Sequence, residues 1–174
     1  EIVPSPRQVA WNCMEFYGFV HFGLYTFDRE HEFATGPEIF NPVNFDARQW
    51  VKAYKAAGMT GLLLTCKHHE GFCLWPSKYT EYTVANTPYK KDILGELVKA
   101  YNAVGIDVHF YFSVLDWSHP DWRSSIKTQE DSIAFQRFLT FTDNQLKELA
   151  TRYPTVKDFW FDGTWDASIK QNGW

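Results

Sequence analysis

Gly61-Leu62-Leu63-Leu64-Thr65-Cys66 is a continuous apolar run that begins at a glycine, in a chain of 174 residues. Such a run is typical of a strand that is buried on both faces, as the strands of a parallel sheet are. A helix is expected just before it, over Ala47–Ala57, with Asp46 as its N-cap and Gly58 at its end. This stretch therefore predicts an α/β protein built on a parallel sheet.

The alternation of strand and helix continues along the whole chain. We expect further strands over 16–22, 108–113 and 159–161, and further helices over 93–104 and 131–153. Long loops follow the first three strands, which is the pattern of a βα repeat. Right-handed crossovers between such strands make the sheet parallel.

Two architectures fit a βα repeat, a (β/α)8 barrel and an open doubly wound sheet. The open sheet usually carries a glycine-rich phosphate loop after its first strand. Here that strand runs into His21-Phe22-Gly23-Leu24-Tyr25, which lacks the G-x-G-x-x-G spacing. We therefore expect a parallel (β/α)8 TIM-like barrel. Because a complete barrel has eight strands in about 250 residues, residues 1–174 should hold about the first four, and their open edges need the missing barrel half as a partner.

The composition narrows the class of protein. With 45% hydrophobic and 22% charged residues, the chain reads as a soluble globular protein. Its net charge is −4 and no cluster of Lys and Arg stands out, so we expect no binding to nucleic acid. Its apolar runs are too short to cross a bilayer, so we expect no membrane association. The start at Glu1-Ile2-Val3-Pro4 shows no signal peptide, although a mature secreted product would look the same.

Three cysteines, Cys13, Cys66 and Cys73, lie in or beside hydrophobic segments. Their odd number does not suit a disulfide framework, so we expect buried thiols. Cys66 and Cys73 flank His68 and His69, but the spacing does not match a structural zinc motif. We therefore expect no metal and no cofactor.

Polar side chains stand where the expected strands end. His21 closes the first strand, His68 and His69 follow the second, Tyr111 lies near the end of the third, and Asp162 closes the fourth. In a parallel barrel these strand ends share one rim, where catalytic groups sit. Taken singly, each residue has a purely structural reading, for example a hydrogen-bonded core histidine.

Asp162 is the most informative of these residues. It ends the aromatic run Phe159-Trp160-Phe161, which we expect to be a buried strand, and Gly163 lets the backbone turn after it. The alternative is an Asp-Gly turn that only caps the strand. His68 and His69 are adjacent, so both can reach a ligand only if the chain turns beyond them, as Gly71 suggests.

These residues can bind hydroxyls and supply a nucleophilic or basic carboxylate, which is what a sugar-cleaving site needs. Aromatic residues make up 18% of the chain, with 8 tryptophans, and tryptophan rings pack on the apolar faces of sugars. A core rich in aromatics accounts for part of this excess.

The chain resembles the catalytic domain of α-L-fucosidases of glycoside hydrolase family 29. Four motifs carry the resemblance, in the order of that family: His21-Phe22-Gly23 with Tyr25, Lys67-His68-His69-Glu70-Gly71-Phe72 with Leu74-Trp75, His109-Phe110-Tyr111-Phe112-Ser113 with Asp116-Trp117, and Trp160-Phe161-Asp162-Gly163 with Trp165. The resemblance implies a retaining glycosidase, with a fucosylated glycan or glycoconjugate as substrate, in a secreted, periplasmic or lysosomal setting.

The resemblance also implies roles for single residues. Asp162 would be the nucleophile, and Tyr111 would lie beneath the reacting ring near it. His21, His68 and His69 would hold fucose hydroxyls. Two further candidates for sugar contact are Glu32 and Phe33, where the family more often has tryptophan than phenylalanine, and Trp165 completes the set of substrate-binding residues.

A retaining glycosidase needs a second carboxyl group roughly 5 Å from the nucleophile. The resemblance places that acid/base in the second half of the barrel, so we expect it outside residues 1–174, together with any β-sandwich domain. We also expect these 174 residues to be inactive by themselves, as a fragment of a longer enzyme or a truncated relative. Two alternatives stay open: a fucose-binding or inactive remnant, and a metal-dependent barrel hydrolase that uses His68 and His69 as ligands.

Overall fold

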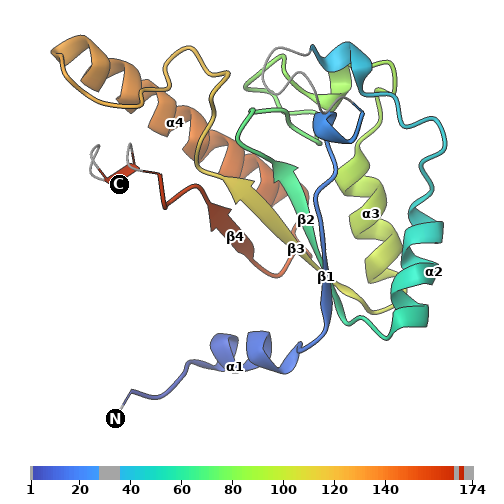
Figure 1. Ribbon diagram of the computed structural model, residues 1–174. Coiled ribbons are helices and arrows are strands. Elements are labelled where there is room, and N and C mark those ends of the chain that lie inside the picture. The colour runs from blue at the N-terminus through green and yellow to red at the C-terminus, as the bar shows by residue number, and fades with distance from the viewer. Residues whose placement is uncertain (1, 28–35, 167–168, 171–174) are drawn as a thin grey trace.

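The computed structural model describes residues 2–27, 36–166 and 169–170. Within these residues, four strands form one parallel sheet in the order β1-β2-β3-β4 (Figure 1). Their bounds are Tyr17–Val20 for β1, Gly61–Lys67 for β2, Asp107–Ser113 for β3 and Phe159–Asp162 for β4. The sequential order of neighbouring parallel strands is the arrangement expected for consecutive strands of a barrel.

The helices that follow the strands pack on one face of this sheet (Figure 1). The α-helices are α1 (Pro6–Cys13), α2 (Ala47–Ala57), α3 (Ile93–Asn102) and α4 (Gln129–Arg152), and the 3-10 helices are η1 (Leu24–Thr26), η2 (Pro37–Ile39) and η3 (Val84–Asn86). Among the described residues, no helix is both long enough and apolar enough to cross a bilayer.

The predicted helix ends are confirmed for α2. The Asp46 side chain accepts a hydrogen bond from the backbone N–H of Arg48, and Gly58 ends the helix at φ 73°. A positive φ of this size suits glycine because it has no Cβ. The capping residues therefore set the length of the helix that precedes β2.

The helix α1 was not predicted. It begins with a capping box in which Ser5 and Gln8 exchange hydrogen bonds, and Pro6 occupies its first turn. These signals are present in the sequence. The helix is only 8 residues long and has no buried residue, so it is too short to show the repeated apolar spacing by which an amphipathic helix is recognised.

Alternation along the strands divides the sheet into two faces. On the helix-covered face, Leu62, Leu64, Val108 and Phe110 join the main hydrophobic core. The residues between them point to the opposite face, because successive side chains of a strand alternate. We call this opposite face the inner face, and it carries Phe19, Leu63, Thr65, His109, Tyr111, Ser113, Trp160 and Asp162.

The prediction that residues 159–161 form a buried strand is wrong in part. The strand β4 exists, but Trp160 is 42% exposed and Phe161 is 46% exposed. The reason is topological: β4 is an edge strand of the sheet, and no strand among the described residues pairs with its outer edge. An apolar sequence indicates a strand, but its burial depends on what packs against it.

The three cysteines are free thiols, and two of them are buried as predicted. Cys66 and Cys73 lie in the main core, whereas Cys13 is exposed. The prediction is wrong for Cys13 because it lies in α1, which packs no residue into the core.

Candidate active site

The ends of all four strands bring the predicted polar residues together. His21 follows β1, His68 and His69 follow β2, and Asp162 ends β4, while Tyr111 stands in β3. The ring centroids of His21 and Tyr111 lie 5.2 Å apart, those of His68 and Tyr111 5.8 Å, and those of His68 and His69 4.2 Å. The structure therefore gathers these five residues at one end of the sheet.

A β-bulge at the end of β2 determines the side of the sheet on which His68 lies. Thr65 pairs with Tyr111, but Lys67 pairs with Phe112, so the register shifts by one residue between Thr65 and Lys67. Cys66 lies in the helix-side core, and Lys67 lies on the same side, over the Phe112 ring at 4.5 Å. Because two consecutive side chains share this side, the next side chain, His68, turns to the inner face.

Lys67 forms a buried ion pair with Asp116. Its Nζ lies 3.2 Å from Asp116 Oδ2, and the two side chains are 0% and 3% exposed. The other carboxylate oxygen accepts hydrogen bonds from Ser118 Oγ at 2.9 Å and from the His119 backbone N–H at 3.1 Å. A buried charge is tolerated only when it is paired and hydrogen-bonded, as this one is. The pair joins the loop after β2 to the loop after β3.

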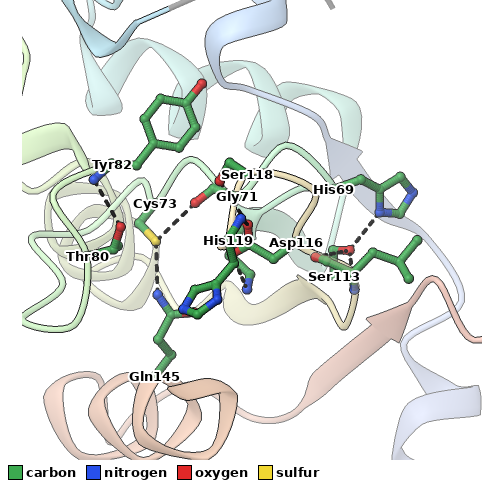
Figure 2. Close-up of polar contacts among 12 residues, drawn as sticks. His69, Gly71, Cys73, Thr80, Tyr82, Ser113, Asp116, Ser118, His119 and Gln145 are labelled. Carbon is green, nitrogen blue, oxygen red and sulfur yellow. Dashed lines mark hydrogen bonds and ion pairs between the residues drawn. The ribbon is translucent and has the colours of Figure 1, made fainter. Parts of the chain in front are cut away.

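Gly71 lets the loop after β2 pass close to Asp116 and Ser118 (Figure 2). Its φ is +88°, and a Cβ at this position would collide with the Asp116 carboxylate and the Ser118 hydroxyl. The same pair of loops is joined by a hydrogen bond from the Trp117 backbone N–H to the His69 carbonyl, at 2.9 Å. The turn predicted at Gly71 is therefore confirmed.

Three donors surround the carboxylate of Asp162. Tyr111 donates its hydroxyl to Oδ2 at 2.5 Å, and Oδ1 accepts from the Gly163 backbone N–H at 2.7 Å and from Trp165 Nε1 at 3.1 Å. Partial burial by itself would raise the pKa of Asp162, but these hydrogen bonds outweigh it and hold the pKa below its ordinary value. Asp162 is therefore ionised at neutral pH.

His69 is electrically neutral beside this carboxylate. Burial and the neighbouring His68 lower the pKa of His69 to about 4, against an opposing effect of Asp162. Burial and His68 also lower the pKa of His21. The shortest approach of His69 to Asp162, from Nε2 to Oδ2, is 3.9 Å, which is too long for a hydrogen bond. A neutral imidazole offers one donor and one acceptor, which suits hydroxyl recognition.

Two tryptophans flank His69. The ring centroids of His69 and Trp117 lie 5.1 Å apart, and those of His69 and Trp165 lie 5.9 Å apart. Both indole rings are substantially exposed. Their apolar surface therefore stands beside the polar groups, an arrangement that suits a ligand with both hydroxyls and apolar faces.

A small cavity of about 40 Å³ lies beside the histidines, and its lining includes His21, Tyr25, His68 and Glu70. Ligand pockets are usually about 300–1,000 Å³, so this cavity is sized for water rather than for a sugar. Glu70 is buried, and its Oε2 lies 3.3 Å from His68 Nδ1 without the alignment of a hydrogen bond. The described residues thus supply one wall of a sugar-sized site and do not enclose it.

Two predicted residues, Glu32 and Phe33, lie outside the described residues. Within the described part of the chain, no group of three or more His, Cys, Asp or Glu side chains could hold a metal ion. The absence of a resident metal or cofactor stays a prediction.

Two residues near the site were not singled out from the sequence, Lys67 as an ion-pair partner and Ser113. His69 Nδ1 lies 2.6 Å from Ser113 Oγ (Figure 2). Ser113 could have been found, because it stands two residues after Tyr111 and so shares its face of the strand. Lys67 could not, because its side depends on the bulge.

Comparisons with a family model, with curated proteins and with solved structures all find alpha-L-fucosidases. The sequence profile described as Alpha-L-fucosidase matches residues 7–174. The chain is 36% identical over 167 residues to Alpha-L-fucosidase 1 of Arabidopsis thaliana, which covers 92% of this chain. It is also similar to the crystal structure of an alpha-L-fucosidase GH29 from Bacteroides thetaiotaomicron, with TM-score 0.90 and 57% identity over 99% of this chain. A mutant of an alpha-L-fucosidase GH29 from the same organism was solved as a trapped covalent intermediate in complex with 2-fluoro-fucosyl fluoride, and it also has TM-score 0.90 and 57% identity to this chain.

The chain spans only part of these relatives. It covers 31% of the Arabidopsis protein and 44% of the Bacteroides chain. The four-stranded parallel sheet thus corresponds to part of the (β/α)8 barrel of GH29 enzymes, which confirms the predicted fold class.

Removing one partner of the buried ion pair should destabilise the protein strongly. We expect Asp116→Ala to lower the free energy of unfolding by about 3–5 kcal/mol, because it leaves the Lys67 charge buried and unpaired. The double variant Lys67→Met/Asp116→Leu should regain most of that loss. Chemical denaturation measures these values, and Asp143→Ala, which breaks an exposed pair with Lys147, is the matched control with little effect. Equal stability of Asp116→Ala and the control would contradict the argument.

Removing the Tyr111 hydroxyl should raise the pKa of Asp162. The hydroxyl stabilises the ionised carboxylate, so Tyr111→Phe favours the protonated form, and ionisation is then lost at a higher pH as the solution is acidified. The pKa can be followed by carbon-13 NMR of the carboxyl group. Tyr101→Phe is the matched control, because Tyr101 is also buried and its hydroxyl has no partner among the described residues. An unchanged pKa in Tyr111→Phe would refute the assignment.

Proposed function

The chain belongs to the alpha-L-fucosidase family, and we propose that the protein containing it hydrolyses α-L-fucosidic bonds with retention of configuration. One observation carries the proposal: an ionised carboxylate, Asp162, is held by three donors among neutral histidines and exposed tryptophans. The relative trapped as a covalent intermediate with 2-fluoro-fucosyl fluoride supports a nucleophilic, double-displacement reaction.

In this proposal Asp162 attacks the anomeric carbon of fucose. Its Oδ1 already accepts two hydrogen bonds, whereas Oδ2 accepts one, from Tyr111, among the described residues. A carboxylate oxygen has about two lone-pair sites, so Oδ2 keeps one for the attack. The bond from Oδ2 to the sugar forms as the glycosidic C–O bond breaks, and the departing oxygen takes a proton from the general acid. Water then cleaves the ester with the same group acting as base.

The histidines and aromatic rings would position the sugar. The rings of His21 and His68 lie 5.2 Å apart and those of His68 and His69 lie 4.2 Å apart, and burial keeps His21 and His69 neutral near pH 7. We assign to these three the fucose hydroxyls. We place Tyr111 beneath the reacting ring and Trp165 beside it, since both contact Asp162. Glu32 and Phe33 remain proposed sugar contacts.

The general acid is proposed to come from the rest of the protein. Of the acids near the rim, Asp116 is locked in its ion pair with Lys67, and Glu70 is buried against His68. Neither carboxyl group is therefore free to protonate a leaving group, as the second carboxyl group of a retaining mechanism must. Residues 1–174 are thus proposed to be the N-terminal half of the catalytic barrel, in a secreted, periplasmic or lysosomal enzyme acting on fucosylated glycans or glycoconjugates.

Covalent labelling tests the proposed nucleophile. After treatment with 2-fluoro-fucosyl fluoride, mass spectrometry of the full-length protein should find one 2-fluorofucosyl group on the peptide that contains Asp162. Asp162→Ala should abolish the label and lower the turnover of an aryl α-L-fucoside by several orders of magnitude. Asp166→Ala, in the same loop, is the control and should keep the label. Labelling of another carboxylate would refute the assignment, and binding without turnover would favour a fucose-binding remnant.

Residues 1–174 expressed alone should be inactive on the same aryl fucoside. Four strands do not close a barrel, so the wall that excludes water and fixes the geometry is incomplete. The assay compares this polypeptide with the full-length protein, with contamination excluded by mass spectrometry. Turnover within about a hundredfold of the few-per-second range of ordinary enzymes would contradict the prediction.

A further inference from the structure

Ser113 is a fully buried residue at the end of β3 (Figure 2). It contacts His69 at Nδ1, whereas Nε2 is the ring nitrogen of His69 that lies near Asp162. Its Oγ lies 2.6 Å from His69 Nδ1. The same oxygen lies 3.0 Å from the backbone nitrogen of Leu115 and 3.0 Å from the Leu115 carbonyl oxygen. Ser113 pairs with Asp162 across β3 and β4 through the backbone, but the contacts of its hydroxyl are with His69 and Leu115 and not with the Asp162 carboxylate. A role of the hydroxyl in the reaction therefore acts through His69.

The three contacts of Ser113 fix where its proton goes. A hydroxyl has one proton to donate and two lone pairs that accept. The Leu115 N–H must donate to Oγ, so the single proton of Ser113 goes either to the Leu115 carbonyl or to His69 Nδ1. Leu115 is fully buried, and among the described residues no other group donates to its carbonyl. An unpaired buried carbonyl costs about 1–3 kcal/mol.

The proton of Ser113 therefore goes to Leu115, and His69 must donate its own Nδ1–H to Ser113 Oγ. Both lone pairs and the proton of the hydroxyl are then used. His69 is neutral, because burial and His68 lower its pKa to about 4. A neutral imidazole carries one N–H, so Nε2 is left with a lone pair.

The bare Nε2 of His69 faces the site beside the nucleophile. It lies 3.9 Å from Asp162 Oδ2. Without a proton it cannot donate to that carboxylate, so it neither neutralises the nucleophile nor occupies its free lone pair. It is available to accept a hydrogen bond.

We propose that Ser113 is a positioning residue, which holds His69 in its Nδ1–H tautomer so that Nε2 accepts a hydrogen bond from a sugar hydroxyl next to Asp162. The assignment of the tautomer is independent of the proposed function, and the identity of the donor as a sugar hydroxyl rests on it. The site would therefore select a sugar with a hydrogen-bond donor at this point, and a group that can only accept hydrogen bonds would bind less well.

Nitrogen-15 NMR of the histidine rings tests the tautomer. In the full-length protein labelled with 15N-histidine, the signals of His69 are assigned by their loss in His69→Gln. We expect the unprotonated ring nitrogen of His69 to show strong correlations to both carbon-bound ring protons, which identifies it as Nε2. A strong correlation to the Hε1 proton alone would identify it as Nδ1 and overturn the proposal.

Variants separate positioning by Ser113 from a general packing effect. Ser113→Ala removes the acceptor for Nδ1–H, so we expect the Nε2–H tautomer to gain population, whereas Ser113→Thr keeps a hydroxyl and should restore the original spectrum. Thr142→Val on α4 is the matched control, because Thr142 is buried and its hydroxyl has no partner among the described residues. A Ser113→Ala spectrum identical to that of the control would overturn the role of Ser113.

Binding of L-fucose tests the acceptor role. At saturation, the His69 Nε2 signal should shift upfield while remaining unprotonated, and kcat/KM for an aryl fucoside should fall about tenfold in Ser113→Ala, the value of one hydrogen bond. Deoxy and deoxyfluoro analogues of fucose identify the hydroxyl that donates to Nε2. At that hydroxyl, replacement by hydrogen and replacement by fluorine should weaken binding equally, since fluorine cannot donate a hydrogen bond. If the chemical shift of His69 Nε2 did not change when fucose binds, the acceptor role would be overturned. Failure of fucose to bind at all would overturn the proposed function, with the tautomer still decided by the free protein.

Discussion

The buried ion pair between Lys67 and Asp116 is the constraint on which the arrangement of this site depends. A lysine ammonium is stable in a protein interior only beside a compensating charge, so the loop after β3 must bring Asp116 to it. Asp116 in turn leaves room only for glycine at position 71, which makes the chain turn just beyond the histidines. One electrostatic requirement thereby couples the loops after β2 and β3.

The ion pair also depends on the bulge at the end of β2. It places Lys67 on the helix side with Cys66, and so turns His68 to the inner face, where Tyr111 and Asp162 already point. Burial then sets the charges: it keeps His69 neutral, while hydrogen bonds keep Asp162 ionised in spite of partial burial. Neutral acceptors and donors beside one anion are what a hydroxyl-rich, uncharged ligand requires.

Much of the architecture could be predicted because local signals agree with it. Asp46 and Gly58 fix the ends of α2 by hydrogen bonding and backbone freedom, and the apolar run of β2 reports burial on both faces. The errors share one cause. The helix α1 and the exposed β4 differ from expectation in what packs against them, which is a property of distant parts of the chain.

The sequence by itself determined the parallel βα order, the helix caps and the family motifs, and so the set of residues at the strand ends, because these follow from spacing, turn chemistry and residue type. Only the tertiary structure decided which way Lys67 and His68 point, that Ser113 lies behind His69, and that Tyr111 donates to Asp162. A one-residue bulge reverses the facing of every side chain beyond it. These hydrogen bonds join residues 44 and 51 positions apart, so the first depends on the pairing of β2 with β3 and the second on the pairing of β3 with β4.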